Sequence, residues 1–180
     1  MQPKFPDFQN TGDTFSDCRS YRYKLWRLNQ PARSLPVAFL MLNPSTATAT
    51  QNDPTVARCE RRAAMLGFDG FFIINIFALV STDPRELYLH PDPVGPDNDQ
   101  HIQAVGDQCG VIICAWGHHG GYRERGAQIL DSFAKRNLTR KLWCLGLNAD
   151  GSPAHPLYLP YDRLPRRMEP PYSRTEWRAQ

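Results

Sequence analysis

The sequence predicts a three-layer α/β fold, a sandwich of helices around a central, mainly parallel sheet of about four strands. Segments with helical periodicity alternate with four short apolar runs, and this alternation is typical of a parallel sheet with helices on both faces. The 180 residues, of which 41% are hydrophobic, suffice for one globular domain. The four runs have the length and the β-branched or aromatic content of buried strands, and they cover residues 37–42, 71–77, 111–116 and 141–147.

Each predicted helix presents an apolar face. The first, at about 53–66, opens with an Asp-Pro pair that suits a helix N-terminus, and Gly67 ends it. A weaker helix is expected at about 97–109 and a third at about 122–137. The side chains expected to point inward are Val56, Cys59, Ala63, Leu66, Ile102, Val105, Ala127, Leu130, Phe133 and Ala134.

We expect a single domain over residues 1–180, with its core at about 20–160 and an irregular tail rich in proline and arginine at 161–180. The alternation of polar and apolar residues at 20–28 predicts an additional antiparallel edge strand. The segment 81–98 is rich in proline and aspartate and too long for a simple connection, so it is either a surface lid or a functional loop.

The composition narrows the class of protein. No apolar run approaches the roughly 18 residues of a membrane span, and the N-terminus lacks the features of a secretory signal. We therefore expect a cytoplasmic protein without membrane association. The five cysteines form no C-x-x-C pair, so neither a metal site nor a cofactor is expected. The net charge of +3 permits a nucleic-acid partner without requiring one, although residues 163–178 carry five arginines.

Polar and aromatic residues end each of the four predicted strands. In open parallel sheets, ligands bind in the crevice outside the carboxyl ends of the strands. We therefore expect these residues to line one ligand pocket. They are Asn43, Pro44, Ser45 and Thr46 after the first strand, Asn75 near the end of the second, Trp116 to Gly121 after the third, and His155, Pro156, Leu157 and Tyr158 beyond the fourth.

Asn75 and Asn43 each allow two interpretations. A buried amide without a partner costs about 1–3 kcal/mol, so Asn75 either bonds to a neighbouring loop backbone or awaits a ligand that has an adjacent N–H and C=O, such as a nucleobase edge. Asn43 and Pro44 form either a turn that ends the strand or a rigid exit that aims the Asn43 amide at a fixed point.

The histidines and Asp53 are also open to two readings. His155 is either a loop residue or an imidazole that polarises a carbonyl and stabilises a developing anion. His118 and His119 make a poor metal site without a third ligand nearby, and the glycines after them could instead lead into a helix N-terminus that receives a phosphate. Asp53 is expected to cap a helix, with a catalytic carboxylate as the alternative.

Four strand-end motifs, taken in order, resemble those of the uracil-DNA glycosylase superfamily. That family has a water-positioning motif G-[IL]-N-P-G, a base-reading L-L-L-N, a strand with L-L-W-G and a final H-P-S-P-L. The chain is also similar to an uncharacterised bacterial family of unknown function that has an MLNPSTA…HPLYLP pattern. The corresponding stretches are MLNPS at 41–45, IIN at 73–75, CAWG at 114–117 and HPLYL at 155–159.

The resemblance implies a role for each matching residue. Asn43 would hold a water near the sugar C1′, Asn75 would read the edge of an extruded base, and His155 would stabilise charge on the departing base. Leu157 or Leu159 would wedge into the base stack. Pro44, Ser45, Trp116 and Tyr158 would complete the substrate site.

The chain departs from the family at three positions. Asn43 stands where the most active members carry an aspartate, Ser45 replaces a glycine, and Leu157 replaces a serine that grips a DNA phosphate. The resulting expectation is recognition of a nucleobase in DNA or a nucleotide, with hydrolysis of the N-glycosidic bond. The alternatives are a non-catalytic module that binds nucleic acid or a nucleotide, and a small-molecule hydrolase that acts on free nucleosides. Oligomeric state is left open.

Overall fold

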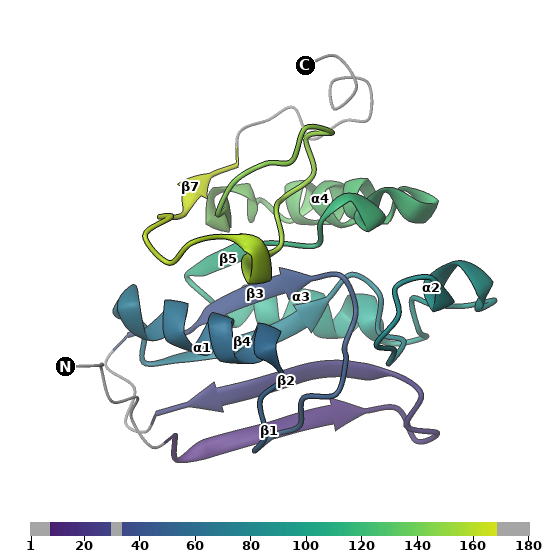
Figure 1. The fold of residues 1–180 in the computed structure, drawn as a ribbon, viewed down its shortest axis with the longest axis horizontal. Coiled ribbons are helices and arrows are strands. Elements are labelled where there is room, and N and C mark those ends of the chain that lie inside the picture. The colour runs from purple at the N-terminus through teal and green to yellow at the C-terminus, as the bar shows by residue number, and fades with distance from the viewer. Residues whose placement is uncertain (1–7, 30–33, 169–180) are drawn as a thin grey trace.

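The structure is a computed structural model in which residues 8–29 and 34–168 are described. Its strands form a single sheet in the order β1-β2-β4-β3-β5-β6-β7, which crosses the centre of the molecule (Figure 1). The strands are β1 (Asn10–Phe15), β2 (Arg22–Leu28), β3 (Val37–Met41), β4 (Gly70–Asn75), β5 (Val111–Cys114), β6 (Leu142–Cys144) and β7 (Arg166–Arg167).

The four predicted strands form the parallel centre of the sheet, β4-β3-β5-β6. From β3 the chain first winds outward to β4, and it then crosses back over β3 to reach β5 and β6. The winding direction therefore reverses between β3 and β5. In doubly wound sheets this switch point opens a crevice at the carboxyl ends of the strands. The mixed α/β architecture is confirmed, and Asn75 and Asn43 lie at that edge, at the end of β4 and just after β3.

The sheet has seven strands instead of about four, because antiparallel strands extend both sides. The predicted strand at 20–28 is present as β2, but it pairs with both β1 and β4 and is not an edge. The residues of β1 are mostly half-buried and few are apolar, so pairing with β2 rather than hydrophobicity fixes this strand. The short β7 lies in the predicted irregular tail, whose residues 169–180 are outside the described part.

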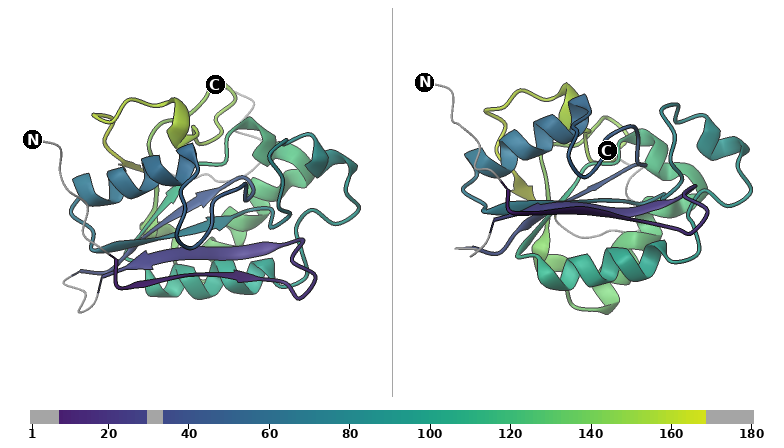
Figure 2. Two further views of the ribbon diagram at one scale, coloured as in Figure 1. Left: turned by 60° about the horizontal axis from the view of Figure 1, so that its bottom comes forward. Right: turned by 90° about the horizontal axis from the view of Figure 1, so that it is seen from below.

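Helices cover both faces of the sheet (Figure 2). Helix α1 (Pro54–Met65) lies on one face, and α3 (Asn98–Gln108) and α4 (Arg125–Lys135) lie on the other. A short helix, α2 (Glu86–Leu89), interrupts the segment predicted as a lid or functional loop. Three 3₁₀ turns complete the elements, namely η1 (His118–Glu124), η2 (Thr139–Lys141) and η3 (Pro156–Tyr158).

The apolar faces of the helices are largely as predicted. The α1 side chains pack on one face of the sheet, together with Phe39, Phe71 and Ile73. On the other face α3 and α4 pack against alternate residues of the same strands. One inward residue is wrong: Ala134 is exposed, because the buried face of α4 is centred on Gly126, Ile129, Leu130 and Phe133 and Ala134 lies outside it. Helix α4 also begins three residues later than predicted, after the 3₁₀ turn η1.

The α1 cap leads to a first testable prediction. The Oδ1 atom of Asp53 accepts a hydrogen bond from the N–H of Val56 at 2.8 Å, as predicted for a helix N-cap. We expect Asp53→Ala to lower the free energy of unfolding by about 1 kcal/mol, because a helix donor loses its partner. Asp53→Asn, which keeps an oxygen acceptor, is the control. Denaturant titrations measure both, and equal losses in the two variants would contradict a capping role.

Candidate functional site

The carboxyl ends of β3 and β4 lie side by side, and the loops that follow them interlock. The Nδ2 group of Asn43 donates to the carbonyl oxygens of Ser81 at 2.8 Å and Pro44 at 3.2 Å. In return, the N–H of Ser81 donates to the Pro44 carbonyl at 2.9 Å. Both amide hydrogens of Asn43 are therefore engaged. Since only the amide nitrogen can donate to carbonyls, these bonds also fix the orientation of the Asn43 Oδ1 atom.

Asn75 is the last residue of β4, where it pairs in register with Met41. Its side chain is 1% exposed, and its Oδ1 atom is buried without a hydrogen-bond partner among the described residues. Side chains alternate along a strand, and Phe71 and Ile73 belong to the α1 face, so Asn75 also points to that face. One interpretation of Asn75 was a hydrogen bond between its side chain and a neighbouring loop backbone, and the Oδ1 atom makes no such bond to the described residues.

The backbone around Asn75 is held from the opposite side of the sheet. The Nδ2 group of Asn98, in α3, donates to the carbonyls of Asn75 at 3.0 Å and Ile76 at 3.2 Å. The Nε of Arg125, in α4, donates to the Ile76 carbonyl at 2.8 Å, and its guanidinium pairs with Asp99. Asn98 and Arg125 are both buried. These bonds leave the Asn75 amide on a rigid strand end.

His155 precedes η3, which packs against α1. Its Nδ1 atom accepts a hydrogen bond from the N–H of Leu157 at 3.4 Å, which leaves the proton on Nε2. Burial lowers the pKa of His155, and the nearby Asp53 carboxylate opposes that change. The imidazole is therefore neutral near pH 7, with an N–H available as a donor.

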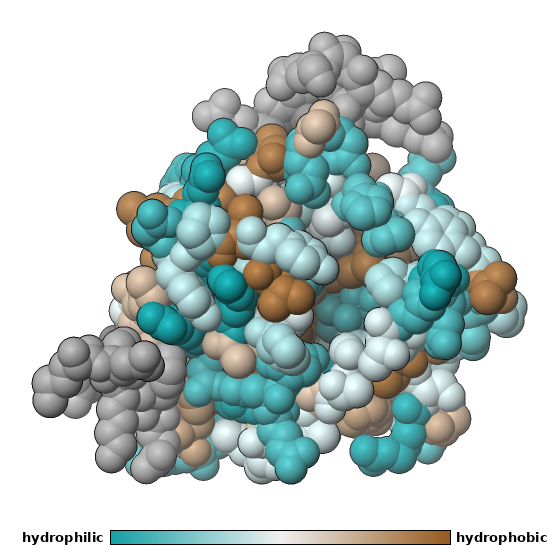
Figure 3. Space-filling model, viewed as in Figure 1, coloured by the Kyte–Doolittle hydropathy of each residue, from teal (hydrophilic) through white to brown (hydrophobic). Residues whose placement is uncertain are grey.

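The other predicted residues around this edge differ in exposure. Pro44 is buried, while Ser45 and Leu157 are half-buried. Tyr158 is 81% exposed, and its ring centroid lies 5.8 Å from that of His155. The surface in Figure 3 is hollowed to the right of centre, where Figure 1 places the ends of β3 and β4.

Trp116 does not lie on the face of the sheet to which Asn75 points. Trp116 is 3% exposed and belongs to the core on the α3 and α4 face, where Gly120 and Gly126 approach its ring closely. A Cβ atom at Gly120 would lie 2.0 Å from the Trp116 ring, so this glycine permits the close packing of the ring. The aromatic ring was visible in the sequence, but the face on which it lies was not.

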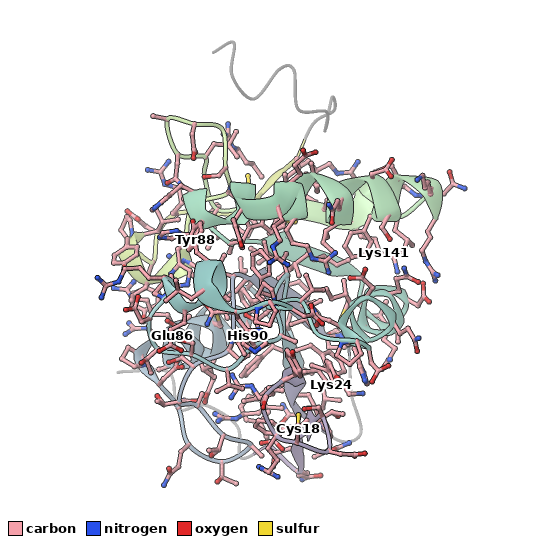
Figure 4. All side chains as sticks on the ribbon, turned by 90° about the vertical axis from the view of Figure 1, so that its right-hand side faces the viewer. Cys18, Lys24, Glu86, Tyr88, His90 and Lys141 are labelled. Carbon is pink, nitrogen blue, oxygen red and sulfur yellow. The ribbon has the colours of Figure 1, made fainter. Side chains whose placement is uncertain are left out.

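His118 and His119 join an aromatic group instead of a metal site. Their ring centroids are 4.0 Å apart, and the Nδ1 of His119 lies 2.8 Å from the hydroxyl of Tyr88 in α2. Figure 4 shows Tyr88 beside Glu86 and His90 on and next to this short helix. Within residues 8–29 and 34–168, no group of three His, Cys, Asp or Glu side chains could hold a metal ion.

Sequence reasoning missed three polar residues near the site, Arg22, Asn98 and Arg125. Arg22 is 2% exposed, and its guanidinium donates to the carbonyl of Ala47 in the loop before α1. Burial lowers the pKa of Arg22, and the Asp53 and Asp13 carboxylates oppose that change. Asn98 and Arg125 are flanked by charged residues or glycine and so carry no sign of burial in the sequence, and Arg22 lies in an alternating segment. Only Asn75 interrupts a continuous apolar run and gave a signal.

The cysteines differ in accessibility, which gives a second testable prediction. Cys18 is exposed in the turn between β1 and β2 (Figure 4), and a hydrogen bond with Ser16 contributes most to lowering its pKa to about 7. Burial raises the pKa of Cys59, Cys109 and Cys114. We expect the rate of alkylation of the native protein by iodoacetamide to rise with pH through about 7, as the Cys18 thiolate forms. Peptide mapping should find the label at Cys18 alone, and Cys18→Ser should abolish it.

Comparison with known proteins gives two kinds of match. The chain is 28% identical over 109 residues to the deaminated glutathione amidase of Homo sapiens, which covers 61% of this chain. The aligned part is 32% of that protein, so the chain spans about a third of the relative's length. No solved structure matches the chain significantly. No helix in the described part is long and apolar enough to cross a membrane.

The second match is to a family that covers most of the fold. Residues 22–157, from β2 to η3, match the family described as protein of unknown function (DUF1643). This range contains the four parallel strands and all of the predicted site residues except Tyr158 and the alternative wedge residue Leu159. The chain belongs to this family of proteins of unknown function, DUF1643.

Proposed function

We propose that the protein recognises a nucleobase at the carboxyl edge of its parallel strands and hydrolyses the N-glycosidic bond of that base in DNA or a nucleotide. The observation that carries the proposal is the buried Asn75 amide, whose Oδ1 atom has no partner within the described residues. A carboxamide offers an acceptor and a donor side by side, which complement the adjacent N–H and C=O of a base edge.

The rigid setting of Asn75 supports recognition rather than packing. An unsatisfied buried polar atom costs about 1–3 kcal/mol, and such costs are retained where they serve a site. Asn98 and Arg125 donate to the Asn75 and Ile76 carbonyls, so the strand end that carries the amide is held in place. A ligand that donates a hydrogen bond to Oδ1 would remove the penalty.

Asn43 and His155 provide the remaining chemistry in this proposal. With both amide hydrogens of Asn43 donated to carbonyls, its Oδ1 atom is left as an acceptor for the hydrogen of a water. The water oxygen forms a bond to the sugar C1′ while the bond from C1′ to the base nitrogen breaks. The electron pair leaves with the base, where the Nε2–H of His155 stabilises the charge, and the water proton passes to the base or to solvent.

We also propose that this mixed α/β fold is specifically a three-layer sandwich of the uracil-DNA glycosylase type. Three features support it: four parallel strands, helices on both faces, and the four motifs in order from residue 41 to residue 159. Two of the matching motifs, MLNPS at 41–45 and IIN at 73–75, lie at the ends of the adjacent strands β3 and β4. The amidase activity named for the human relative is not proposed here, because the match covers only 32% of that protein.

A screen tests the proposed reaction directly. The purified chain is incubated with single- and double-stranded oligonucleotides that each carry one uracil, deaminated or alkylated base, and alkali-labile breaks are scored. We expect breaks at one class of base in the wild type and loss of selectivity in Asn75→Ala. Release of no base from any oligonucleotide or nucleotide, together with no binding preference among bases, would refute the proposal.

A non-catalytic binding module is the second candidate, and one observation favours it. The Asn43 amide donates to the Ser81 carbonyl and so has a structural role that does not require a water. A single-turnover assay beside a binding titration separates the two candidates. Salt-dependent binding that prefers one base, without any abasic product, would select the binding module.

A further inference from the structure

Three arginines of α1 surround one tyrosine on the surface next to the candidate site. The guanidinium carbons of Arg58, Arg61 and Arg62 lie 4.7, 4.2 and 5.3 Å from the ring centroid of Tyr161. We refer to these four residues as the arginine cluster. Cation–π contacts of this kind hold the flexible side chains in place, so the cluster gathers three positive charges, of which that of Arg62 is buried.

No carboxylate forms an ion pair with these arginines within the described residues. Arg62 is buried and serves the fold, since its guanidinium donates to the carbonyls of Leu159, Pro160 and Arg163. Burial, and after it the charge of Arg58, lowers the pKa of Arg62, while Cys59, Tyr161 and Asp162 oppose the change. Gathering like charges is costly, and an anion bound at the cluster would offset that cost.

The two other arginines retain donors for a ligand. Arg58 gives one Nη1 hydrogen to the Leu159 carbonyl at 2.8 Å. Arg61 makes no hydrogen bond to the described residues, and its Nε atom is buried without a partner. An arginine has five N–H donors arranged as a planar fork that matches the oxygens of a phosphate. Arg58 and Arg61 are therefore the members of the cluster suited to bind one.

The surroundings of the cluster add positive charge and an exposed ring. The segment after η3 runs beside α1 toward β7 (Figure 1) and carries Arg163, Arg166 and Arg167, all exposed. Tyr158 stands at the start of this segment with 81% of its surface exposed. Basic side chains that follow the backbone, combined with aromatic rings on which bases stack, are typical of surfaces that bind single-stranded nucleic acid.

We propose that the arginine cluster binds the phosphodiester backbone of a single-stranded nucleic acid, and that Tyr158 stacks on one of its bases beside His155. This inference rests on the proposed function for the base at the strand ends, and it names the substrate as a polymer rather than a free nucleotide. A membrane surface would supply phosphate as well, but Arg58 and Arg61 are half-buried against Tyr161, so a narrow strand reaches them more readily than a flat bilayer does.

The test is a fluorescence anisotropy titration of the full chain with a labelled oligothymidine strand of about 15 nucleotides, at about 50 to 200 mM salt. Arg58→Gln/Arg61→Gln should reduce the magnitude of the negative slope of log K against log salt by roughly 1.4, because each phosphate contact on a single strand contributes about 0.7. Arg61→Gln alone should lower it by roughly half as much. The charge-matched control is Arg136→Gln/Arg140→Gln, since both arginines are exposed and lie outside the cluster, at the C-terminus of α4 and in η2.

Two further probes separate the parts of the inference. Tyr158→Ala should weaken binding of oligothymidine but not of a strand built from base-free sugar phosphates. Equal slopes in the cluster variant and the control would overturn the inference, as would equally tight, cluster-dependent binding to phosphatidylserine vesicles. Neither result touches the proposed function, which fails instead if Asn75→Ala keeps the wild-type selectivity among bases.

Discussion

Asn75→Leu is expected to raise the free energy of unfolding by about 1–3 kcal/mol and at the same time to abolish selection among bases. The Asn75 Oδ1 atom is buried without a partner among the described residues, so folding removes it from water without compensation. Leucine has a similar size and no polar atom to desolvate, and the neighbouring β4 residues Ile73 and Ile74 are apolar. A gain in stability with a loss of function is the expected sign of a polar group kept for a ligand.

Asn98→Leu is the matched control. Asn98 is as buried as Asn75, and its Oδ1 atom is likewise without a partner among the described residues, but its Nδ2 group donates to the carbonyls of Asn75 and Ile76. Its replacement leaves two buried acceptors without that donor, so we expect a loss of about 1–3 kcal/mol. Denaturant unfolding measures both variants. If Asn75→Leu loses as much stability as Asn98→Leu, the Asn75 amide is a structural residue and the base-reading role is wrong.

The strands and helices were largely predictable because burial leaves a pattern in the sequence. The apolar runs that became β3 to β6 are buried on both faces, and α1 has a cap, an apolar face and Gly67, whose φ is +80°. The strand β1 left no such pattern, since its half-buried residues are held by pairing with β2. Its presence depends on a partner strand, which periodicity within one segment does not reveal.

The candidate site was predictable only in part, for a similar reason. Asn75 gave a signal because a polar residue inside an apolar run needs an explanation. Trp116 gave a misleading one, because its ring lies under α4 on the opposite face from Asn75. Arg125 gave none: its burial arises where α3 and α4 converge on the end of β4, and a charged residue at a helix start reads as exposed.

His155→Ala is expected to slow base release by about 10²- to 10³-fold at saturating substrate, with little change in binding. In the proposed reaction the His155 Nε2–H meets charge that appears only as the glycosidic bond breaks, so its loss affects the rate rather than the affinity. His155→Gln, which can still present an N–H, should recover part of the rate. His101→Ala is the control, because His101 is a half-buried histidine stacked on Tyr23, and its pKa is also lowered by burial.

The pH profile distinguishes this role from acid catalysis by a protonated imidazole. Burial lowers the pKa of His155 below its ordinary value of 6.5, so the neutral form predominates from pH 6.5 upward. The rate should therefore show no change attributable to His155 between pH 6.5 and 8, since a neutral donor has no proton to lose there. Because burial disfavours the charged imidazole, the folded state loses stability relative to the unfolded chain as pH falls below 6.5, and protonation also removes the Nδ1 acceptor for the Leu157 N–H. An inflection near pH 7 that disappears in His155→Gln, or a wild-type rate in His155→Ala, would contradict the neutral-donor mechanism.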